Sequence, residues 1–326
     1  MAKISHKPRV IFAGTAEFAI PALAKLLKLA DICLVITQPA KPAGRGLIET
    51  HCPVDLFAQD SHLPIFRPTS LKRELIEDTM RDYECDYLIV AAYGKILPQW
   101  LLNFPKYRAL NIHGSLLPKW RGASPIQHAL LAGDKKTGVN LMEMTLGMDE
   151  GPILLTLTCD IQSHDTVEDL TKKLGKMGAD LLDQFLRNPQ IKSVPQEGDI
   201  SYAPKIEKVM GQIDWHNHSA STIQKAFRAF TPWPGLYSWT ENNLRLKILS
   251  LGPTQDISDS EKDLKPGALK IEQQSLWALC KDQWIALTEI QMAGKNKMLS
   301  IEALKDKNHW IHTLKTLKTC GADANV

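Results

Sequence analysis

Short, continuously apolar segments alternate with segments of helical periodicity over roughly the first 186 residues, and this alternation constrains the fold most. Strands that are apolar along their whole length are buried on both faces of a sheet. Their alternation with helices predicts an α/β domain with a doubly wound, mainly parallel sheet. The expected strands are 10–13, 32–37, 87–92, 110–113, 139–144 and 153–158, and the expected helices include 71–81 and 167–186.

The pattern changes after residue 187. A polar connector begins at about residue 188, and an amphipathic helix is expected over 219–230. Short strand-like segments separated by Gly and Pro follow it, at 244–249, 275–279 and 284–287. Such a succession is typical of a small β-barrel, here of OB-like type. We therefore expect two domains, residues 1–206, with the connector as their last part, and residues 207–326.

Composition excludes some classes of protein. The chain has 39 Lys and Arg against 36 Asp and Glu, a net charge of +3. This balance excludes a polycationic nucleic-acid coat protein, and it neither implies nor excludes an RNA partner. The six cysteines form no C-x-x-C pair, which is typical of reduced thiols in a cytosolic protein. The apolar segment near the start is short and interrupted by Gly14 and Glu17, which argues against a signal peptide. No apolar segment of the sequence is long enough to span a bilayer, so we expect a cytoplasmic protein.

Residues 111–122 read Asn-Ile-His-Gly-Ser-Leu-Leu-Pro-Lys-Trp-Arg-Gly, at the end of one expected strand. Because side chains alternate between the faces of a strand, Asn111 and His113 project to the same side. The carboxyl end of a strand in an open α/β sheet is where ligands bind. An amide N–H beside an imidazole can stabilise a developing oxyanion while the imidazole handles a proton. Two polar residues without a function at a strand end would give the same Asn-x-His pattern. The flanking residues must therefore distinguish a catalytic pair from an incidental one.

A second motif, Gly147-Met148-Asp149-Glu150-Gly151, could by itself be a turn. Together with the segment 111–122, it resembles the signature of the folate-dependent formyltransferases, and within them the members that act on a charged tRNA. The resemblance is dense from about residue 9 to about residue 186. It continues in islands at 202–205, 213–215 and 233–234. Ala16, Ala40 and Lys41 depart from the expected Pro, Asp and Arg, away from the proposed chemistry.

This resemblance implies transfer of the formyl group of 10-formyltetrahydrofolate to the amino group of initiator methionyl-tRNA. Asn111 and His113 would stabilise the oxyanion. Asp149 would tune His113, because a carboxylate favours the protonated form of a nearby imidazole. The second domain would bind along the tRNA.

The resemblance also implies which residues hold the folate. Two leucines make an apolar slot for a flat pterin, and a proline stiffens the loop that carries them. Main-chain groups after the third expected strand would meet the pterin edge. The implied folate-binding residues are Ser115, Leu116, Leu117, Pro118, Lys95, Ile96 and Leu97.

The segment 41–46 combines two cations with Pro and Gly, which suits a mobile loop that contacts phosphates. Without the resemblance it would be interpreted as a solvated basic loop. The resemblance implies that Lys41 and Arg45 approach the acceptor stem of the tRNA. No metal is expected, because His51-Cys52 and His216-Asn217-His218 lack companions at ligand spacing.

Two alternative functions remain open at this point. A formyltransferase could act on a small amine, such as a purine-pathway ribonucleotide or an amino sugar, but such an acceptor needs neither the basic loop nor the barrel. A catalytically inactive RNA-binding protein on a nucleotide-binding scaffold is the other alternative. The presence of Asn111, His113 and Asp149 together argues against it.

Overall fold

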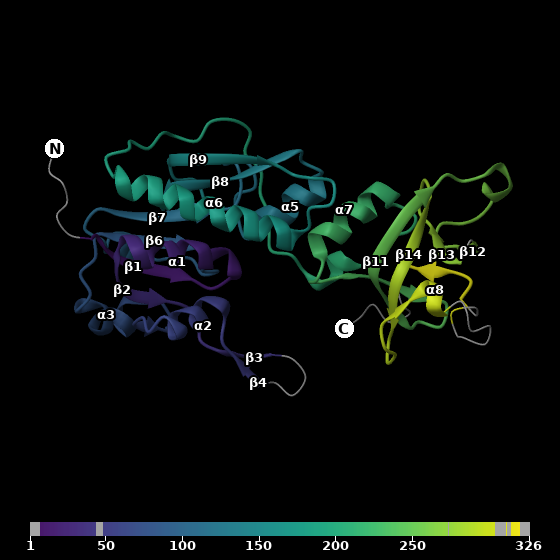
Figure 1. Cartoon of the computed structure of the whole chain (residues 1–326), viewed down its shortest axis with the longest axis horizontal. Helices are drawn as coiled ribbons and strands as arrows, with labels where there is room; N and C mark the ends of the chain where they lie inside the picture. Colours follow the sequence, from purple (N-terminus) through teal and green to yellow (C-terminus); the bar gives the residue numbers. More distant parts are fainter. Residues whose placement is uncertain (1–6, 44–47, 273, 304–310, 312–313, 320–326) are drawn as a thin grey trace. The chain divides into compact units, whose positions relative to one another are not determined.

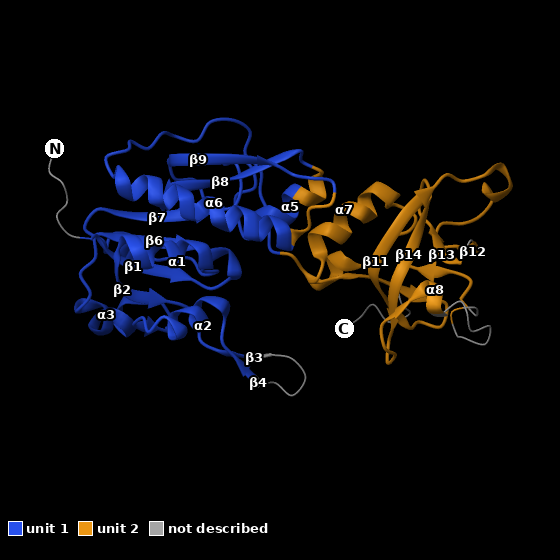
Figure 2. Ribbon diagram, viewed as in Figure 1, with its two compact units in different colours: residues 1–129, 134–163, 168–205 blue, residues 130–133, 164–167, 206–326 orange. Residues whose placement is uncertain are grey.

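The computed structural model describes residues 7–43, 48–272, 274–303, 311 and 314–319. Its contacts divide the chain into two compact units (Figure 2). Unit 1 comprises Met1–Ala129, Asp134–Ser163 and Glu168–Lys205, and unit 2 comprises Leu130–Gly133, His164–Val167 and Ile206–Val326. The sequence placed the main boundary after residue 206. It did not indicate that two short earlier segments belong with unit 2.

Unit 1 is built on a seven-stranded sheet of order β5-β2-β1-β6-β7-β8-β9 (Figure 1). The five neighbouring strands β5, β2, β1, β6 and β7 are parallel to one another. Strand β8 is antiparallel to β7, and β9 is antiparallel to β8. The predicted doubly wound, mainly parallel sheet is therefore confirmed, with two antiparallel strands at one edge. The strands are β1 (Arg9–Gly14), β2 (Asp31–Ile36), β5 (Ile65–Phe66), β6 (Tyr87–Ala91), β7 (Arg108–His113), β8 (Lys136–Glu143) and β9 (Ile153–Asp160).

Helices pack on both faces of this sheet. On one face, Ile76 and Met80 of α3 and Leu101 of α4 join a buried cluster with side chains of β1, β2 and β6. On the other face, α6 lies so close to β7 that a Cβ on Gly178 would be 2.6 Å from a methyl carbon of Ile112, so glycine permits this approach. The helices are α1 (Ile20–Leu29), α2 (Pro53–Asp60), α3 (Arg73–Arg81), α4 (Gln99–Leu102), α5 (Pro125–Ala132) and α6 (Val167–Arg187).

Unit 2 combines one amphipathic helix with an antiparallel sheet. Helix α7 (Ala220–Phe230) begins after Ser219, whose hydroxyl accepts a hydrogen bond from the Thr222 N–H and so caps the helix. The sheet has the order β12-β13-β14-β11-β10-β16, and β15 pairs with β14. Its strands are β10 (Leu236–Thr240), β11 (Arg245–Gln255), β12 (Leu269–Glu272), β13 (Ser275–Leu279), β14 (Trp284–Met292), β15 (Met298–Leu299) and β16 (Leu317–Lys318).

The two ends of this sheet meet. Ala268 forms an antiparallel bridge with Thr316. The Leu317 N–H donates to the Gly267 carbonyl at 2.7 Å, and the Leu269 N–H donates to the Lys315 carbonyl at 2.9 Å. These bonds connect the β12 end to the β16 end and close the sheet, which confirms the predicted barrel.

Strand β11 is longer than the sequence predicted. The expected segment ended at residue 249, before Gly252-Pro253, but β11 continues through both residues to Gln255. The register with β14 shifts between Ile248 and Ser250 and twice more along the strand. Such irregularities let a strand bend and tolerate a proline that cannot donate to the ladder.

The remaining elements are short. Helix α8 spans Ser300–Ala303, and 3-10 helices span Glu17–Ala19, Lys208–Gly211 and Asp259–Glu261. None of the helices in the described part of the chain is long and apolar enough to cross a membrane.

Candidate active site

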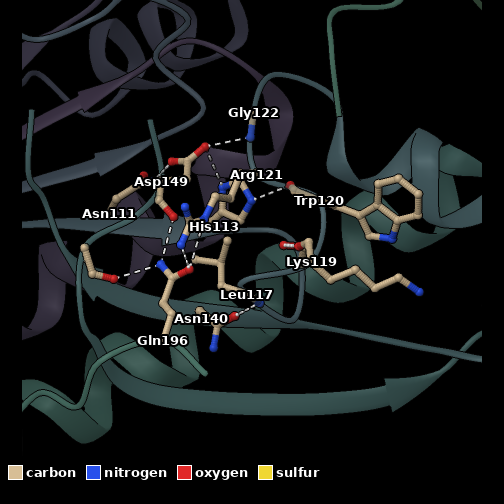
Figure 3. Close-up of polar contacts among 12 residues, drawn as sticks. Asn111, His113, Leu117, Lys119, Trp120, Arg121, Gly122, Asn140, Asp149 and Gln196 are labelled. Atoms are coloured by element: carbon tan, nitrogen blue, oxygen red, sulfur yellow. Dashed lines mark hydrogen bonds and ion pairs between the residues drawn. The ribbon is translucent and has the colours of Figure 1, made fainter. Parts of the chain in front are cut away.

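The three predicted catalytic residues lie close together: Asn111 and His113 belong to strand β7, and Asp149 lies on the loop between β8 and β9 (Figure 3). The Asn111 amide donates from Nδ2 to Asp149 Oδ1 at 3.2 Å, and His113 Nδ1 lies 3.6 Å from Asp149 Oδ2. The backbone N–H of Gly122 donates to the same Oδ2 at 2.9 Å. His113 is only 6% exposed, so its imidazole is largely shielded from water. The structure thus brings Asn111, His113 and Asp149 into one cluster, as the sequence analysis expected.

The loop between β8 and β9 reaches this cluster by folding back. Strand β8 ends at Glu143, near the start of β7, because the antiparallel register pairs Leu110 with Glu143 and His113 with Asn140. The loop must therefore return along β7 to place Asp149 against His113. Asp149 itself has φ +51°, in the left-handed region, where Asp is tolerated better than most residues.

A flanking glycine in the acidic motif is explained by this path. A Cβ on Gly151 would collide with the Glu143 carbonyl oxygen, so the close approach of the two backbone segments requires glycine. The second glycine of the Gly-x-Asp-x-Gly motif is thus a backbone requirement of the loop as well as part of a sequence signature.

The two nitrogens of His113 face different partners. Nε2 lies 3.0 Å from the Trp120 carbonyl oxygen, which can only accept, so the partners assign the proton to Nε2. Nδ1 faces the Asp149 carboxylate, 3.6 Å from Oδ2, which is beyond hydrogen-bond distance. Because Nε2 is committed to the carbonyl, Nδ1 is the position through which His113 can exchange a proton with a ligand.

Trp120 is fixed in an unusual conformation that aims its carbonyl at His113. Its φ is +63°, which is rare for a bulky residue and marks local strain. Its N–H donates to Ser201 Oγ at 3.0 Å, and its indole Nε1 donates to Asp134 Oδ2 at 2.8 Å. The ring also stacks on His128, with 5.7 Å between ring centroids. Sequence analysis did not identify these supporting residues, because they come from separate segments.

The predicted folate residues 115–118 form a tightly held turn. Ser115 is fully buried and donates from Oγ to the Lys119 carbonyl at 2.6 Å. The Leu117 N–H donates to Asn140 Oδ1 at 2.8 Å (Figure 3). Leu116 is half-buried over Gly138, whose missing side chain leaves room for it. Leu117 and Pro118 are buried. These bonds make the turn rigid, and its contact with a pterin stays a prediction.

Residues 95–97 follow β6, as expected from the sequence. The Lys95 ammonium donates to the Pro68 and Thr69 carbonyls at 3.0 and 3.1 Å. Burial, together with the nearby charge of Lys41, lowers the pKa of Lys95. Leu97 is buried, whereas the Ile96 side chain is 84% exposed. A role for this segment in folate binding therefore concerns its backbone rather than the Ile96 side chain.

The predicted tRNA-contacting segment is only partly described. Lys41 lies in β3 (Lys41–Ala43), which pairs antiparallel with β4 (Ile48–Thr50), so this part of the expected loop is a two-stranded ribbon. The Lys41 ammonium donates to Gln38 Oε1 at 2.8 Å. Arg45 lies outside the described residues.

Gln196 and Arg121 belong to the site, and the sequence analysis missed both roles. The Gln196 amide donates from Nε2 to the Asp149 and Gly151 carbonyls, both at 2.8 Å. Its Oε1 accepts from Arg121 Nε at 3.1 Å and from Arg121 Nη2 at 2.7 Å. Gln196 lies in the segment interpreted as a connector, where neither periodicity nor spacing marks a functional residue.

Neither possible metal motif gathers a ligand set. His51 Nδ1 lies 2.7 Å from Asp55 Oδ2, and His218 Nδ1 accepts from the Asp214 N–H. Among the residues that the structure describes, no group of three or more His, Cys, Asp or Glu could hold a metal ion.

Comparison with known families places the chain in one of them. The formyl transferase family model matches residues 9–186, which is more than half of the chain, and the model of the formyl transferase C-terminal domain matches residues 205–308. This chain belongs to the formyl transferase family. It is therefore an enzyme of folate-dependent formyl transfer, and the amide, imidazole and carboxylate of its site are groups that such a reaction can use.

Individual formyl transferases show how far the similarity extends. The methionyl-tRNA formyltransferase of Nitrosospira multiformis is 39% identical over 302 residues, which cover 91% of this chain and 95% of the relative. WlaRD, a sugar 3N-formyl transferase crystallised with dTDP and 5-N-formyl-THF, superposes with a TM-score of 0.62 at 21% identity, over 90% of this chain and 100% of WlaRD.

HypX of Aquifex aeolicus, in complex with tetrahydrofolic acid, superposes with a TM-score of 0.59 at 16% identity, over 92% of this formyl transferase. The matched region is 47% of HypX, so the chain spans about half the length of that protein. At these identities the two structural likenesses show a shared fold alone.

Proposed function

We propose that this formyl transferase moves the formyl group of 10-formyltetrahydrofolate to the amino group of initiator methionyl-tRNA. The convergence of Asn111, His113 and Asp149 carries the chemical part of the proposal. The methionyl-tRNA formyltransferase relative, which matches this chain over nearly its whole length, supports the choice of acceptor.

Asn111 is suited to stabilise the oxyanion that develops when an amine attacks the formyl carbon. One N–H of its amide is directed to Asp149, and the second has no partner among the described residues. An amide donor that is already oriented needs little reorganisation when negative charge appears on the formyl oxygen.

His113 is suited to take a proton from the attacking amine. Its Nδ1 is the nitrogen that can exchange, and the Asp149 carboxylate beside it stabilises the imidazolium that forms. Asp149 in turn is oriented by the Gly122 N–H and the Asn111 amide. When the tetrahedral intermediate collapses and the bond from the formyl carbon to the folate nitrogen breaks, His113 gives the proton that it took from the amine to the leaving nitrogen, so that the transfer balances.

The experiment is to incubate the enzyme with 10-formyltetrahydrofolate and methionine-charged initiator tRNA, and to measure formylmethionine. Methionine-charged elongator tRNA, free methionine and an amino sugar nucleotide serve as alternative acceptors. We expect rapid formylation of the initiator species and slow or no formylation of the others. Preferential formylation of a small amine would contradict the proposed acceptor and support the rival formyltransferase function. No formylation of any amine would contradict the proposal altogether.

A further inference from the structure

Beyond Met144, which packs against the buried cluster of unit 1, the acidic loop between β8 and β9, which is described throughout, has no large apolar side chain that is buried. Leu146 and Met148, two large apolar side chains in the loop, are 66% and 61% exposed. Within the described residues, the backbone of 145–151 accepts hydrogen bonds from Gln196 alone. Hydrophobic burial therefore contributes little to the position of residues 145–151. Hydrogen bonds from the Gln196 side chain, which lies outside the loop, hold the loop backbone instead.

The Gln196 side chain uses both ends of its amide. Its nitrogen donates to the Asp149 and Gly151 carbonyls, one on each side of Glu150, and its oxygen accepts two bonds from the Arg121 guanidinium (Figure 3). An amide has two N–H donors and two acceptor sites, so every one is engaged. The opposite amide orientation would place donors against a guanidinium and an oxygen against carbonyls, so these partners fix the rotamer.

The backbone on either side of Gln196 is also fixed. Val194 and Ile153 exchange backbone hydrogen bonds of 2.8 and 2.7 Å, at the start of β9. Farther along, the Arg121 N–H donates to the Ser201 carbonyl at 2.9 Å, and the Ala203 N–H donates to the Arg121 carbonyl at 2.7 Å. The backbone is therefore held on both sides of Gln196, at Val194 and at Ser201, and Gln196 lies between these points beside the acidic loop.

We propose that Gln196 is a positioning residue for formyl transfer, which holds the acidic loop so that the Asp149 carboxylate stays against His113 and Asn111. This proposal rests on the proposed function. A displacement of about 1 Å at a catalytic centre can lower a rate by about a hundredfold, so two hydrogen bonds to the loop backbone have a catalytic effect out of proportion to their contribution to stability.

Gln196→Glu and Gln196→Met separate the two ends of the amide. The carboxylate of Gln196→Glu still accepts from Arg121, but it has no N–H and is repelled by the two loop carbonyls. Gln196→Met keeps the length of the side chain and loses both sets of bonds. Gln190→Glu is the matched control, because Gln190 is exposed on the same segment. Each full-length enzyme is assayed for kcat, for KM of both substrates and for its pH–rate profile, with active sites counted by folate titration.

We expect kcat to fall about tenfold to a hundredfold in both Gln196 variants, with small changes in the two KM values. The pH–rate profile of both should move in the same direction as that of Asp149→Asn, which a merely structural role would not cause. Gln190→Glu should match the wild type. Should a variant fail to fold, Gln196→Asn takes its place, since it keeps an amide but is one methylene too short to reach both carbonyls.

Wild-type kcat and pH dependence in Gln196→Glu would overturn the proposal. A normal Gln196→Glu beside a slow Gln196→Met would also overturn it, because Gln196 would then serve Arg121 rather than the loop. The proposed function is tested separately by the wild-type enzyme in the same assay. If the wild type formylates another amine instead, the acceptor is wrong, and the Gln196 variants are compared on that amine.

Discussion

At the scale of single residues, His113 lies between two acceptors, the Trp120 carbonyl at Nε2 and the Asp149 carboxylate at Nδ1. The Trp120 carbonyl belongs to the backbone and no substitution removes it, whereas the Asp149 carboxylate can be replaced by mutation. Each side chain of the site can therefore be substituted by itself, with Asp149 as the partner that Asn111 and His113 share.

We predict that Asn111→Ala and His113→Ala each lower kcat by about a hundredfold or more, with little change in folate binding. The reason is the loss of an oxyanion donor in one variant and of the proton acceptor in the other. Steady-state formylation at saturating folate measures the effect, and Asn103→Ala, at the exposed end of α4, is the control. Near-normal turnover in either variant would refute the role assigned to that residue.

Asp149→Asn should also be slow, because it removes the charge beside His113 Nδ1 while keeping the size of the side chain. Its pH–rate profile should differ from that of the wild type. An unchanged profile would show that Asp149 and His113 are not coupled.

Arg45, which lies outside the described residues, carries a prediction that rests on the sequence. If it contacts a tRNA phosphate, Arg45→Ala should slow formylation of methionyl-tRNA more than it weakens folate binding. It should also reduce the log–log salt dependence of tRNA binding by about one unit. Lys41→Ala should act in the same direction but less, because an ammonium orients phosphate less rigidly than a guanidinium.

Formylation and tRNA binding at several salt concentrations measure these effects, with Arg73→Ala as a control for loss of an exposed positive charge. An Arg45→Ala enzyme that matches the wild type across the salt series would mean that the segment 41–46 is only a solvated connection.

At the scale of elements, helix α2 is tied to the segment after β5 by a buried carboxylate. Asp55 is fully buried and accepts hydrogen bonds from Arg67 at 2.6 and 2.8 Å and from Gln59 at 2.9 Å, and it lies 2.7 Å from His51 Nδ1. Burial acts to raise the pKa of Asp55, but hydrogen bonds from Arg67, Gln59 and His51 outweigh it and lower that pKa from 3.8 to about 2.

A carboxylate with a lowered pKa stabilises the folded state above its unfolded pKa and loses that contribution as the pH falls through the folded value. We therefore predict that Asp55→Asn lowers the free energy of unfolding of unit 1 at pH 7 by on the order of 2 kcal/mol. The variant should also have a flatter pH dependence between about pH 5 and pH 2. Urea unfolding at a series of pH values measures both, with the exposed Asp60→Asn as control. Parallel pH curves for Asp55→Asn and the wild type would show that this carboxylate is not a stabilising ion.

At the scale of the whole molecule, the proposed catalytic residues all lie in unit 1, whereas the closed barrel lies in unit 2. We propose that unit 2 contributes tRNA affinity and no chemistry. Two segments from earlier in the chain belong to unit 2: Gly133 lies next to the Lys225 side chain, and the Asp165 carbonyl accepts from Arg228 at 3.1 Å. A truncation at residue 205 therefore removes partners of 130–133 and 164–167.

We predict that a fragment ending at Lys205 keeps a folate site but binds methionyl-tRNA much more weakly than the full chain. Filter binding at one fixed salt concentration measures tRNA affinity, and calorimetric titration with a folate measures the other site. Circular dichroism establishes first that the fragment folds. Equal tRNA affinity of the fragment and the full chain would refute this division of labour.

Much of this architecture is determined by the sequence alone, because the relevant signals are local. Continuous apolar segments and helical periodicity predict burial on both faces of a strand or on one face of a helix, and Ser219 marks the start of α7. The period of two along β7 places Asn111 and His113 on the same side, and the structure brings both to Asp149. Each inference depends on residues that are neighbours in the chain.

Other features were decided only by the tertiary structure. The antiparallel direction of β8 makes the acidic loop fold back. Trp120 has a positive φ and is held by hydrogen bonds to Ser201 and Asp134. Gln196 reaches the loop from a segment without a pattern. Apolar patterning records whether a residue is buried and says nothing of which distant segment covers it. Such pairings depend on the closure of loops of 14 to 81 residues and on hydrogen-bond partners that exist only once the chain has folded.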